Sequence, residues 1–243
     1  AAAVMTTARV SLFLPGALAW TLVRRRDRPG LALRQVLCVA LPAALLVGGW
    51  VVRNWVVVGA PVVTTESGES FWAANGPWTF EFLPDRSIDL AVGAAYASLS
   101  DEHGAQLAAL RGREVVADRL LQRWGWQYVA AHPGAVLGGS VRKVWSAVSG
   151  RLSPARAGVE SIGYTAFFAP VHVLALLGLW RRRARQDQAL VGCLLAAFAA
   201  TTAVYWAHTS HKSVIDALLF VCAAGAAGDL LGVVSGRAGA PRR

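Results

Sequence analysis

Long apolar runs dominate the pattern of hydrophobic and polar positions along this chain. Five runs approach the roughly 20 mostly apolar residues that a helix needs to cross a membrane. They cover residues 1–23, 33–52, 160–180, 189–207 and 213–234. The pattern predicts an all-α membrane protein with about five transmembrane helices. Tryptophans sit near the ends of these runs, where amphipathic rings prefer the membrane surface; they are Trp20, Trp50, Trp55, Trp180 and Trp206.

Short basic loops predict the orientation of these helices. Arginines cluster after the first, third and fifth runs, within residues 24–28, 181–185 and 237–243. Loops rich in Lys and Arg stay on the cytoplasmic side, and five crossings bring all three clusters to that side. We therefore expect a multi-pass protein of the cell membrane with residues 53–159 extracytoplasmic. The expected parts are two transmembrane helices in 1–52, the long loop 53–159, and three transmembrane helices in 160–243.

The long loop itself divides into two halves. Up to Pro84 it is rich in Gly, Thr, Ser and aromatic residues, which favours irregular or short-strand structure. From about 102 to 131 apolar residues recur near a spacing of 3.6, and Pro133 separates this stretch from a second one at about 134–149. The second is too short and too charged to span. We expect both to be amphipathic interfacial helices lying on the membrane surface.

Composition and charge narrow the possible functions. The chain is 55% hydrophobic and only 16% charged, with a net charge of +10. The basic residues lie beside apolar runs, so we expect anionic membrane lipids as partners and no nucleic acid. Cys38, Cys193 and Cys222 lie inside apolar runs and resemble small hydrophobic residues more than a disulfide or metal framework. The motifs of nucleotide-binding loops, zinc proteases, serine hydrolases and dinucleotide-binding domains do not occur.

Polar residues where the second run emerges form the first candidate site. Arg53 and Asn54 stand between two tryptophans, and Glu66 and Asn75 follow in the next polar stretch. A guanidinium binds phosphate through two parallel hydrogen bonds, so this group fits the floor of a lipid-phosphate site. The alternative is an anchor at the membrane surface followed by a turn. The pair Arg142-Lys143 offers the same choice between general headgroup contact and a specific phosphate contact.

The loop between the last two runs holds the second group of candidates. His208 and His211 are three residues apart, but the sequence places no third or fourth ligand, so we predict no metal site, and a divalent metal stays open as a cofactor. Asp216 lies near the start of the last run, where an acid is a functional candidate by default. Lys212 stands one turn earlier and can neutralise it.

The order of these motifs resembles a known family. Trp-Val-Val-Arg-Asn-Trp at 50–55 is followed by Val-Val-Val-Gly-Ala-Pro-Val, a Thr/Gly-rich stretch, and Trp-Ala-Ala-Asn-Gly-Pro at 72–77. Downstream, an amphipathic stretch within 114–145 contains His-Pro-Gly and then a Lys and a Trp. The series is similar to polyprenyl-phosphate-dependent glycosyltransferases of the GT-C superfamily, such as protein mannosyltransferases and aminoarabinose transferases. The resemblance covers roughly residues 33–220, and the loop at 210–212 departs from it because no Pro follows Lys212.

The resemblance implies transfer of a hexosyl or pentosyl group from a polyprenyl-phosphate carrier to an extracytoplasmic acceptor. The family's catalytic acid lies in an earlier loop, so we expect this chain to be the C-terminal portion of a longer polypeptide, with the catalytic residue unknown here. The competing hypotheses are a non-enzymatic membrane protein, such as a transporter or assembly subunit, and an inactive fragment. The expected lipid-phosphate ligands are Arg53, Arg142, Lys143 and Lys212, and the expected substrate ligands are Asn54, Glu66, Asn75, His211 and Asp216.

Overall fold

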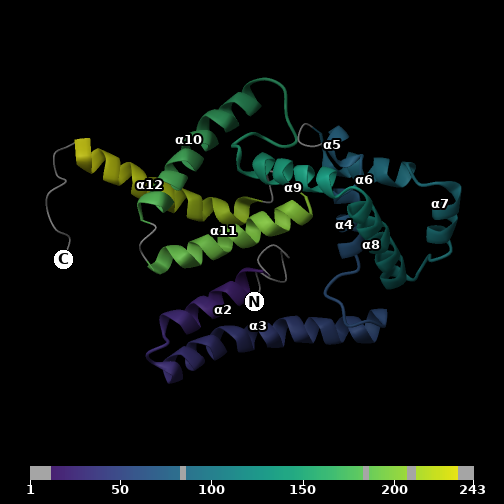
Figure 1. Cartoon of the computed structure of the whole chain (residues 1–243), viewed down its shortest axis with the longest axis horizontal. Coiled ribbons are helices and arrows are strands. Elements are labelled where there is room, and N and C mark those ends of the chain that lie inside the picture. The colour runs from purple at the N-terminus through teal and green to yellow at the C-terminus, as the bar shows by residue number, and fades with distance from the viewer. Residues whose placement is uncertain (1–11, 83–85, 183–185, 207–211, 235–243) are drawn as a thin grey trace.

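The chain folds into helices throughout the part that its computed structural model describes. The structure describes residues 12–82, 86–182, 186–206 and 212–234, and within these ranges every regular element is a helix (Figure 1). This confirms the expectation of an all-helical protein.

Three helices are long and apolar enough to cross a membrane. They are α3 (Pro29–Val58), α10 (Val159–Arg181) and the Ile215–Gly232 part of α12 (Ser213–Val234). They match the runs at 33–52, 160–180 and 213–234. The described apolar parts of α2 (Phe13–Arg24) and α11 (Gln186–Val204) are shorter, so the total of five crossings stays a prediction.

The surface of the longest helix suits lipid better than water. Leu33, Leu37, Leu41 and Leu45 recur every four residues along α3 and are all exposed. Only 6% of the most apolar stretch of this helix is buried inside the protein. A continuous exposed apolar face of this size marks a surface that contacts lipid or protein. The three long helices therefore indicate membrane association.

Two of the long helices, α10 and α12, are held together by a close approach at a glycine and by an ion pair. α10 packs along α12, and Gly178 lets the two backbones approach closely at Cys222. At the end of α10, Arg182 donates a hydrogen bond to the Gly225 carbonyl at 2.9 Å and pairs with Asp229 at 2.8 Å. α2 packs against both α3 and α11.

The turn between α2 and α3 and the end of α10 carry arginines and lie at the same end of the helices in Figure 1. The start of α11 lies at that end too, and the helices from α4 to α9 lie at the other. The side of the membrane stays a prediction, and the basic cluster at 237–243 lies outside the described residues.

The described part of the first half of the long loop contains helices and no strand, so the short-strand interpretation is wrong there, whereas residues 59–66 are irregular as expected. The helices described there are α4 (Ser67–Ala74) and α5 (Thr79–Phe82), and α6 (Ile88–Ala97) follows. The start of α4 is held from a distance: Asp118 accepts hydrogen bonds from the backbone N–H groups of Gly68 at 2.7 Å and Glu69 at 3.1 Å. A carboxylate at a helix start satisfies N–H groups that have no partner within the helix.

The predicted helix at 102–131 is two helices. α7 (Asp101–Ala108) and α8 (Glu114–Ala131) are separated by a turn in which Gly112 has a φ of 77°, a conformation that favours glycine. The second predicted helix is confirmed as α9 (Pro133–Val148). Trp72 of α4 contacts the rings of Trp78, Tyr96 in α6 and Trp124 in α8, with ring centroids 5.2, 5.4 and 6.2 Å away.

Candidate lipid-phosphate site

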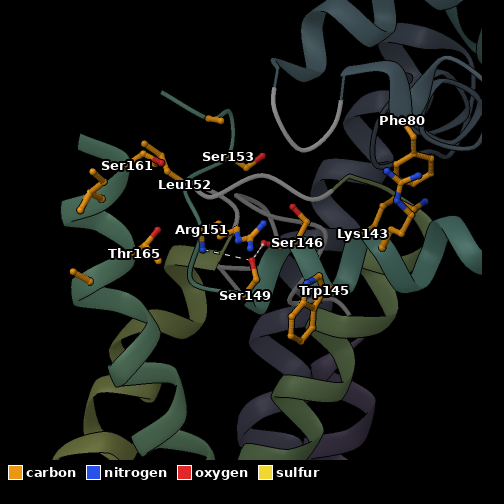
Figure 2. A pocket seen from close by; sticks show the side chains of 14 residues that line it. Phe80, Lys143, Trp145, Ser146, Ser149, Arg151, Leu152, Ser153, Ser161 and Thr165 are labelled. Atoms are coloured by element: carbon orange, nitrogen blue, oxygen red, sulfur yellow. Dashed lines mark hydrogen bonds between the residues drawn. The ribbon is translucent and has the colours of Figure 1, made fainter. Parts of the chain in front are cut away.

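A pocket of about 750 Å³ opens between α9 and the start of α10 (Figure 2). We call it the serine-lined pocket. Its polar lining consists of Arg142, Lys143, Ser146, Ser149, Arg151, Ser153, Ser161 and Thr165. Its apolar lining consists of Phe80, Trp145, Leu152, Ala155, Ile162 and Ala166.

Helical spacing and one sharp turn bring this lining together. Arg142 and Ser146 on α9 and Ser149 directly after it follow each other at intervals of four and three residues and therefore share a face. On α10, Ser161 and Thr165 do the same. Gly150 turns the chain between the two helices with a φ of 74°, and a Cβ added to it would come within 2.9 Å of the Ala169 backbone.

The loop that closes the pocket is tied to the end of α9. The Ser149 hydroxyl donates a hydrogen bond to the Ser146 carbonyl at 3.2 Å and accepts one from the backbone N–H of Arg151 at 3.4 Å (Figure 2). Within the described part of the chain, no hydrogen bond or ion pair engages the Arg151 guanidinium. Its donors are therefore available to a ligand.

The electrostatics of the pocket favour an anion. Three cationic and five hydroxyl side chains line it, and its lining contains no Asp or Glu. The Arg142 guanidinium lies 4.3 Å from the centre of the Phe80 ring, a cation–π contact that holds it in place. Charge-assisted hydrogen bonds from guanidinium groups are the strongest that a phosphate oxygen receives from protein. Apolar residues beside them can contact the chain that a lipid phosphate bears.

Lys143 joins three helices at the back of the pocket. Its ammonium donates hydrogen bonds to the Ala74 carbonyl at 3.2 Å, the Asn75 side-chain oxygen at 3.1 Å and the Val204 carbonyl at 3.4 Å. The residue is only 1% exposed. Burial lowers the pKa of Lys143 to about 7, whereas three oxygen acceptors oppose this shift by favouring the charged form. Lys143 is thus a structural member of the pocket wall as well as a source of positive charge.

Asn75 belongs to the same cluster. Its side-chain NH₂ donates to the carbonyls of Phe71 and Val204, each at 2.8 Å, while its oxygen accepts from Lys143. The structure therefore brings three predicted residues together: Asn75, Arg142 and Lys143. Of these, Arg142 is the one that is exposed and directed to a ligand-sized space.

Arg53 and Asn54 make a different set of contacts at the end of α3. Arg53 donates to the Asn54 side-chain oxygen at 2.9 Å and lies 5.1 Å from the Trp50 ring centre. Asn54 is buried and donates to the Val62 and Val63 carbonyls at 2.8 and 3.2 Å. Asn54 thus closes the turn after α3, and Arg53 remains exposed. Their predicted ligand roles stay predictions.

The remaining predicted residues divide between two further places. Lys212 is buried, lies 3.6 Å from the Asp216 carboxylate and 3.3 Å from the His172 ring, and so confirms the expected neutralisation of Asp216. Glu66 is exposed and shares a second, acidic surface pocket with Glu69, Glu114 and Asp118. His211 lies outside the described residues. Within the described ranges, no group of three or more His, Cys, Asp or Glu side chains is arranged to hold a metal ion.

Sequence reasoning missed most of the serine-lined pocket. A usable signal was present: polar residues are dense between the amphipathic helix and the next apolar run. The missed residues are Ser146, Ser149, Arg151, Ser153, Ser161 and Thr165.

Comparison with known proteins adds nothing to these geometric observations. No family model, no curated protein and no solved structure matches the chain. The resemblance to GT-C glycosyltransferases therefore stays a prediction.

Proposed function

We propose that this chain is part of an integral membrane glycosyltransferase that takes its sugar from a polyprenyl-phosphate carrier and transfers it to an extracytoplasmic acceptor. The observation on which the proposal rests is the serine-lined pocket, with its convergent cations and hydroxyl groups beside apolar side chains. A polyprenyl phosphate needs both kinds of surface, because its headgroup is an anion and its tail is a hydrocarbon.

The position of the pocket along the helices supports this ligand. Residues Ser161 and Thr165 belong to the first turns of α10, a helix long enough to cross the membrane. A lipid phosphate stays at the surface while its tail is buried, so a site at the end of a spanning helix is at the depth where the phosphate lies.

The exposed face of α9 also supports a position of the pocket at the depth of the lipid phosphate. Leu137, Val141, Trp145 and Val148 are all exposed and lie on one side of the helix, opposite the buried Gly139, Lys143 and Ala147. An amphipathic helix with an exposed apolar face and a tryptophan lies in the plane of the membrane surface. α9 then separates the lipid from the rest of the extracytoplasmic helices and opens the pocket toward the membrane.

In the proposed reaction the bond between the anomeric carbon and the phosphate oxygen breaks, and the electron pair stays on the phosphate. The acceptor oxygen forms the new bond to that carbon and gives its proton to a general base. From the resemblance, we expect this base to be an acidic residue outside this chain. Arg142 and Arg151 would stabilise the charge that develops on the departing phosphate, because fixed cations stabilise the transition state where charge forms.

Binding of a polyprenyl monophosphate tests the proposal. The chain is placed in phosphatidylcholine nanodiscs, and the affinity for the lipid phosphate is measured for wild type, Arg151→Ala and Arg156→Ala. Loss of one charge-assisted hydrogen bond predicts about tenfold weaker binding for Arg151→Ala. Arg156 is the matched control: it lies in the same loop, is exposed, does not line the pocket and pairs with Glu160 at 3.0 Å.

The outcomes separate the competing functions. Binding that depends on Arg151 but not on Arg156, together with sugar transfer by membranes that hold the full polypeptide, supports the proposal. Arg151-dependent binding without any transfer favours a non-enzymatic lipid-binding subunit or an inactive fragment. Equal affinity in all three proteins would remove the pocket as a phosphate site.

A further inference from the structure

A second, smaller pocket adjoins the serine-lined pocket. Its volume is about 380 Å³, and we call it the glycine-lined pocket. Gly76, Gly134, Gly138 and Gly139 form much of its wall, with Asn75 and Tyr128 beside them.

The two pockets share three residues, Phe80, Arg142 and Lys143. Arg142 rests over the Phe80 ring at 4.3 Å, so this stacked pair stands on the boundary between the two spaces. A ligand whose phosphate binds Arg142 from the serine-lined pocket has its next chemical group at the entrance of the glycine-lined pocket. The geometry thus defines two adjoining chambers with Arg142 and Lys143 on their common wall.

The lining of the second chamber fits a compact polar group. Glycines leave room for a ligand close to the backbone, and a Cβ added to Gly134 or Gly138 would meet nothing within 4 Å. Tyr128 is stacked on His132 with ring centres 4.4 Å apart, and it presents an aromatic ring and a hydroxyl group at the pocket wall. Ligand pockets usually measure roughly 300–1,000 Å³. This chamber is near the lower limit, which suits one sugar ring and not a polyprenyl tail.

We infer that the glycine-lined pocket binds the saccharide of the lipid-linked donor, with Arg142 holding the phosphate at the junction of the two chambers. The inference rests on the proposed function, because it needs the phosphate in the serine-lined pocket. It adds a chemical class of ligand, a neutral hydroxylated ring, and names residues 134–139 and Tyr128 as determinants of sugar specificity. The N–H groups of Gly134 and Ala135 lie in the first turn of α9, where helix N–H groups have no partner within the helix. They and the Tyr128 hydroxyl can form hydrogen bonds to sugar hydroxyls, and such bonds discriminate strongly against a ligand that lacks the hydroxyls.

A substitution that fills the chamber without a clash tests this inference. Gly138→Leu and Gly134→Leu each add a side chain at a position that lines the pocket and where an added Cβ meets no atom within 4 Å. Gly104→Leu is the matched control, because Gly104 is also helical with nothing within 4 Å of an added Cβ, and it lines neither pocket. Retained helical content in nanodiscs shows that each variant folds.

Three probes are titrated into each protein: polyprenyl monophosphate, glucosyl polyprenyl phosphate and arabinosyl polyprenyl phosphate. We expect wild type and Gly104→Leu to bind at least one sugar-linked probe about tenfold more tightly than the bare phosphate, as one or two added hydrogen bonds predict. We expect Gly138→Leu and Gly134→Leu to lose this preference while their affinity for the bare phosphate stays within about twofold of wild type, because the phosphate contacts are untouched.

Three results would overturn the inference. They are equal wild-type affinity for all three probes, a preference that survives both leucine variants, and a loss of bare-phosphate affinity in those variants that equals the loss for the sugar-linked probes. Each of these leaves the proposed function standing if Arg151→Ala still weakens binding of the bare phosphate. If Arg151→Ala has no effect, the proposed function fails first.

Discussion

Two places in this molecule present arginine beside tryptophan near the end of a long apolar helix, and they differ in what surrounds the guanidinium. At the end of α3, which we call the α3 exit, Arg53 lies above Trp50 and donates a hydrogen bond to Asn54, whose own side chain closes a turn. At the start of α10, Arg142 and Arg151 converge with five hydroxyl groups on one pocket. A motif of basic and aromatic residues therefore indicates membrane depth, whereas a ligand site needs convergence from several elements.

Both places should face the same side of the membrane. A reporter-fusion measurement of topology tests this, and it has the largest expected effect, because each fusion is either active or silent. A reporter active only in the cytoplasm should be active when fused after Arg182 and silent when fused near Glu102. The physical reason is the retention of basic loops in the cytoplasm. The same reporter inserted after Gly59, just past the α3 exit, should also be silent. Activity at Glu102 with silence at Arg182 would reverse the orientation, and activity at only one of Gly59 and Glu102 would separate the two places.

Removing both arginines of the pocket should give the next largest effect. In Arg142→Ala/Arg151→Ala, each lost charge-assisted hydrogen bond weakens binding about tenfold, so two losses predict a decrease of between about tenfold and a hundredfold, depending on how strongly the two arginines couple through the shared phosphate. The measurement is the affinity for polyprenyl monophosphate in nanodiscs. Arg142→Lys with Arg151→Lys keeps the charges but loses the planar fork, so it should fall between wild type and the alanine pair. Wild-type affinity in the alanine pair would contradict the account.

Lys143 should make the stability of the folded protein depend on pH. Burial lowers its pKa from 10.5 to about 7. Between these values the unfolded chain binds more protons than the folded chain, so stability should rise with pH, by at most about 1.4 kcal/mol per pH unit. The thermal midpoint, followed by tryptophan fluorescence in detergent, should therefore increase from pH 7 to pH 9 in wild type relative to Lys143→Met. Parallel pH profiles for the two proteins would show that Lys143 stays charged, held by its three oxygen acceptors.

Arg53 should give the smallest effect. A single exposed cation at an anionic surface contributes roughly 1 kcal/mol, or about fivefold in affinity. Salt screens exposed charges over about 8 Å at physiological ionic strength. Arg53→Ala should thus weaken binding of anionic lipid vesicles about fivefold or less, and the difference should vanish at high salt. A larger loss that persists in salt would make the α3 exit a phosphate site equal to the pocket.

The sequence predicted the elements whose signal is local. The apolar runs became α3, α10 and α12, and the hydrophobic spacing after Pro133 became α9. It failed for α4, because the carboxylate that holds the start of this helix belongs to Asp118, some 50 residues later in the chain. It failed for the turn at Gly112 because the hydrophobic spacing continues on both sides of it.

The candidate site was predicted only in part for the same reason. Arg142 and Lys143 were found because their charges stand out within an amphipathic helix. Ser161 and Thr165 are ordinary residues at the start of an apolar run, and they become a site only when the turn at Gly150 brings α10 against α9. Asn75 and Lys143 were both predicted, but their contact joins residues 68 positions apart and has no signature in either segment.

The central claim, that the phosphate of a polyprenyl lipid binds between α9 and α10, is tested most directly by photo-crosslinking. A polyprenyl monophosphate with a diazirine on the isoprene unit next to the phosphate is added to the chain in phosphatidylcholine nanodiscs, and labelled peptides are identified by mass spectrometry. The account predicts labelling at the apolar lining of the pocket, Leu152, Ile162 and Ala166, that unlabelled polyprenyl phosphate displaces. Displaceable labelling confined to residues 50–63, at the α3 exit, would contradict it.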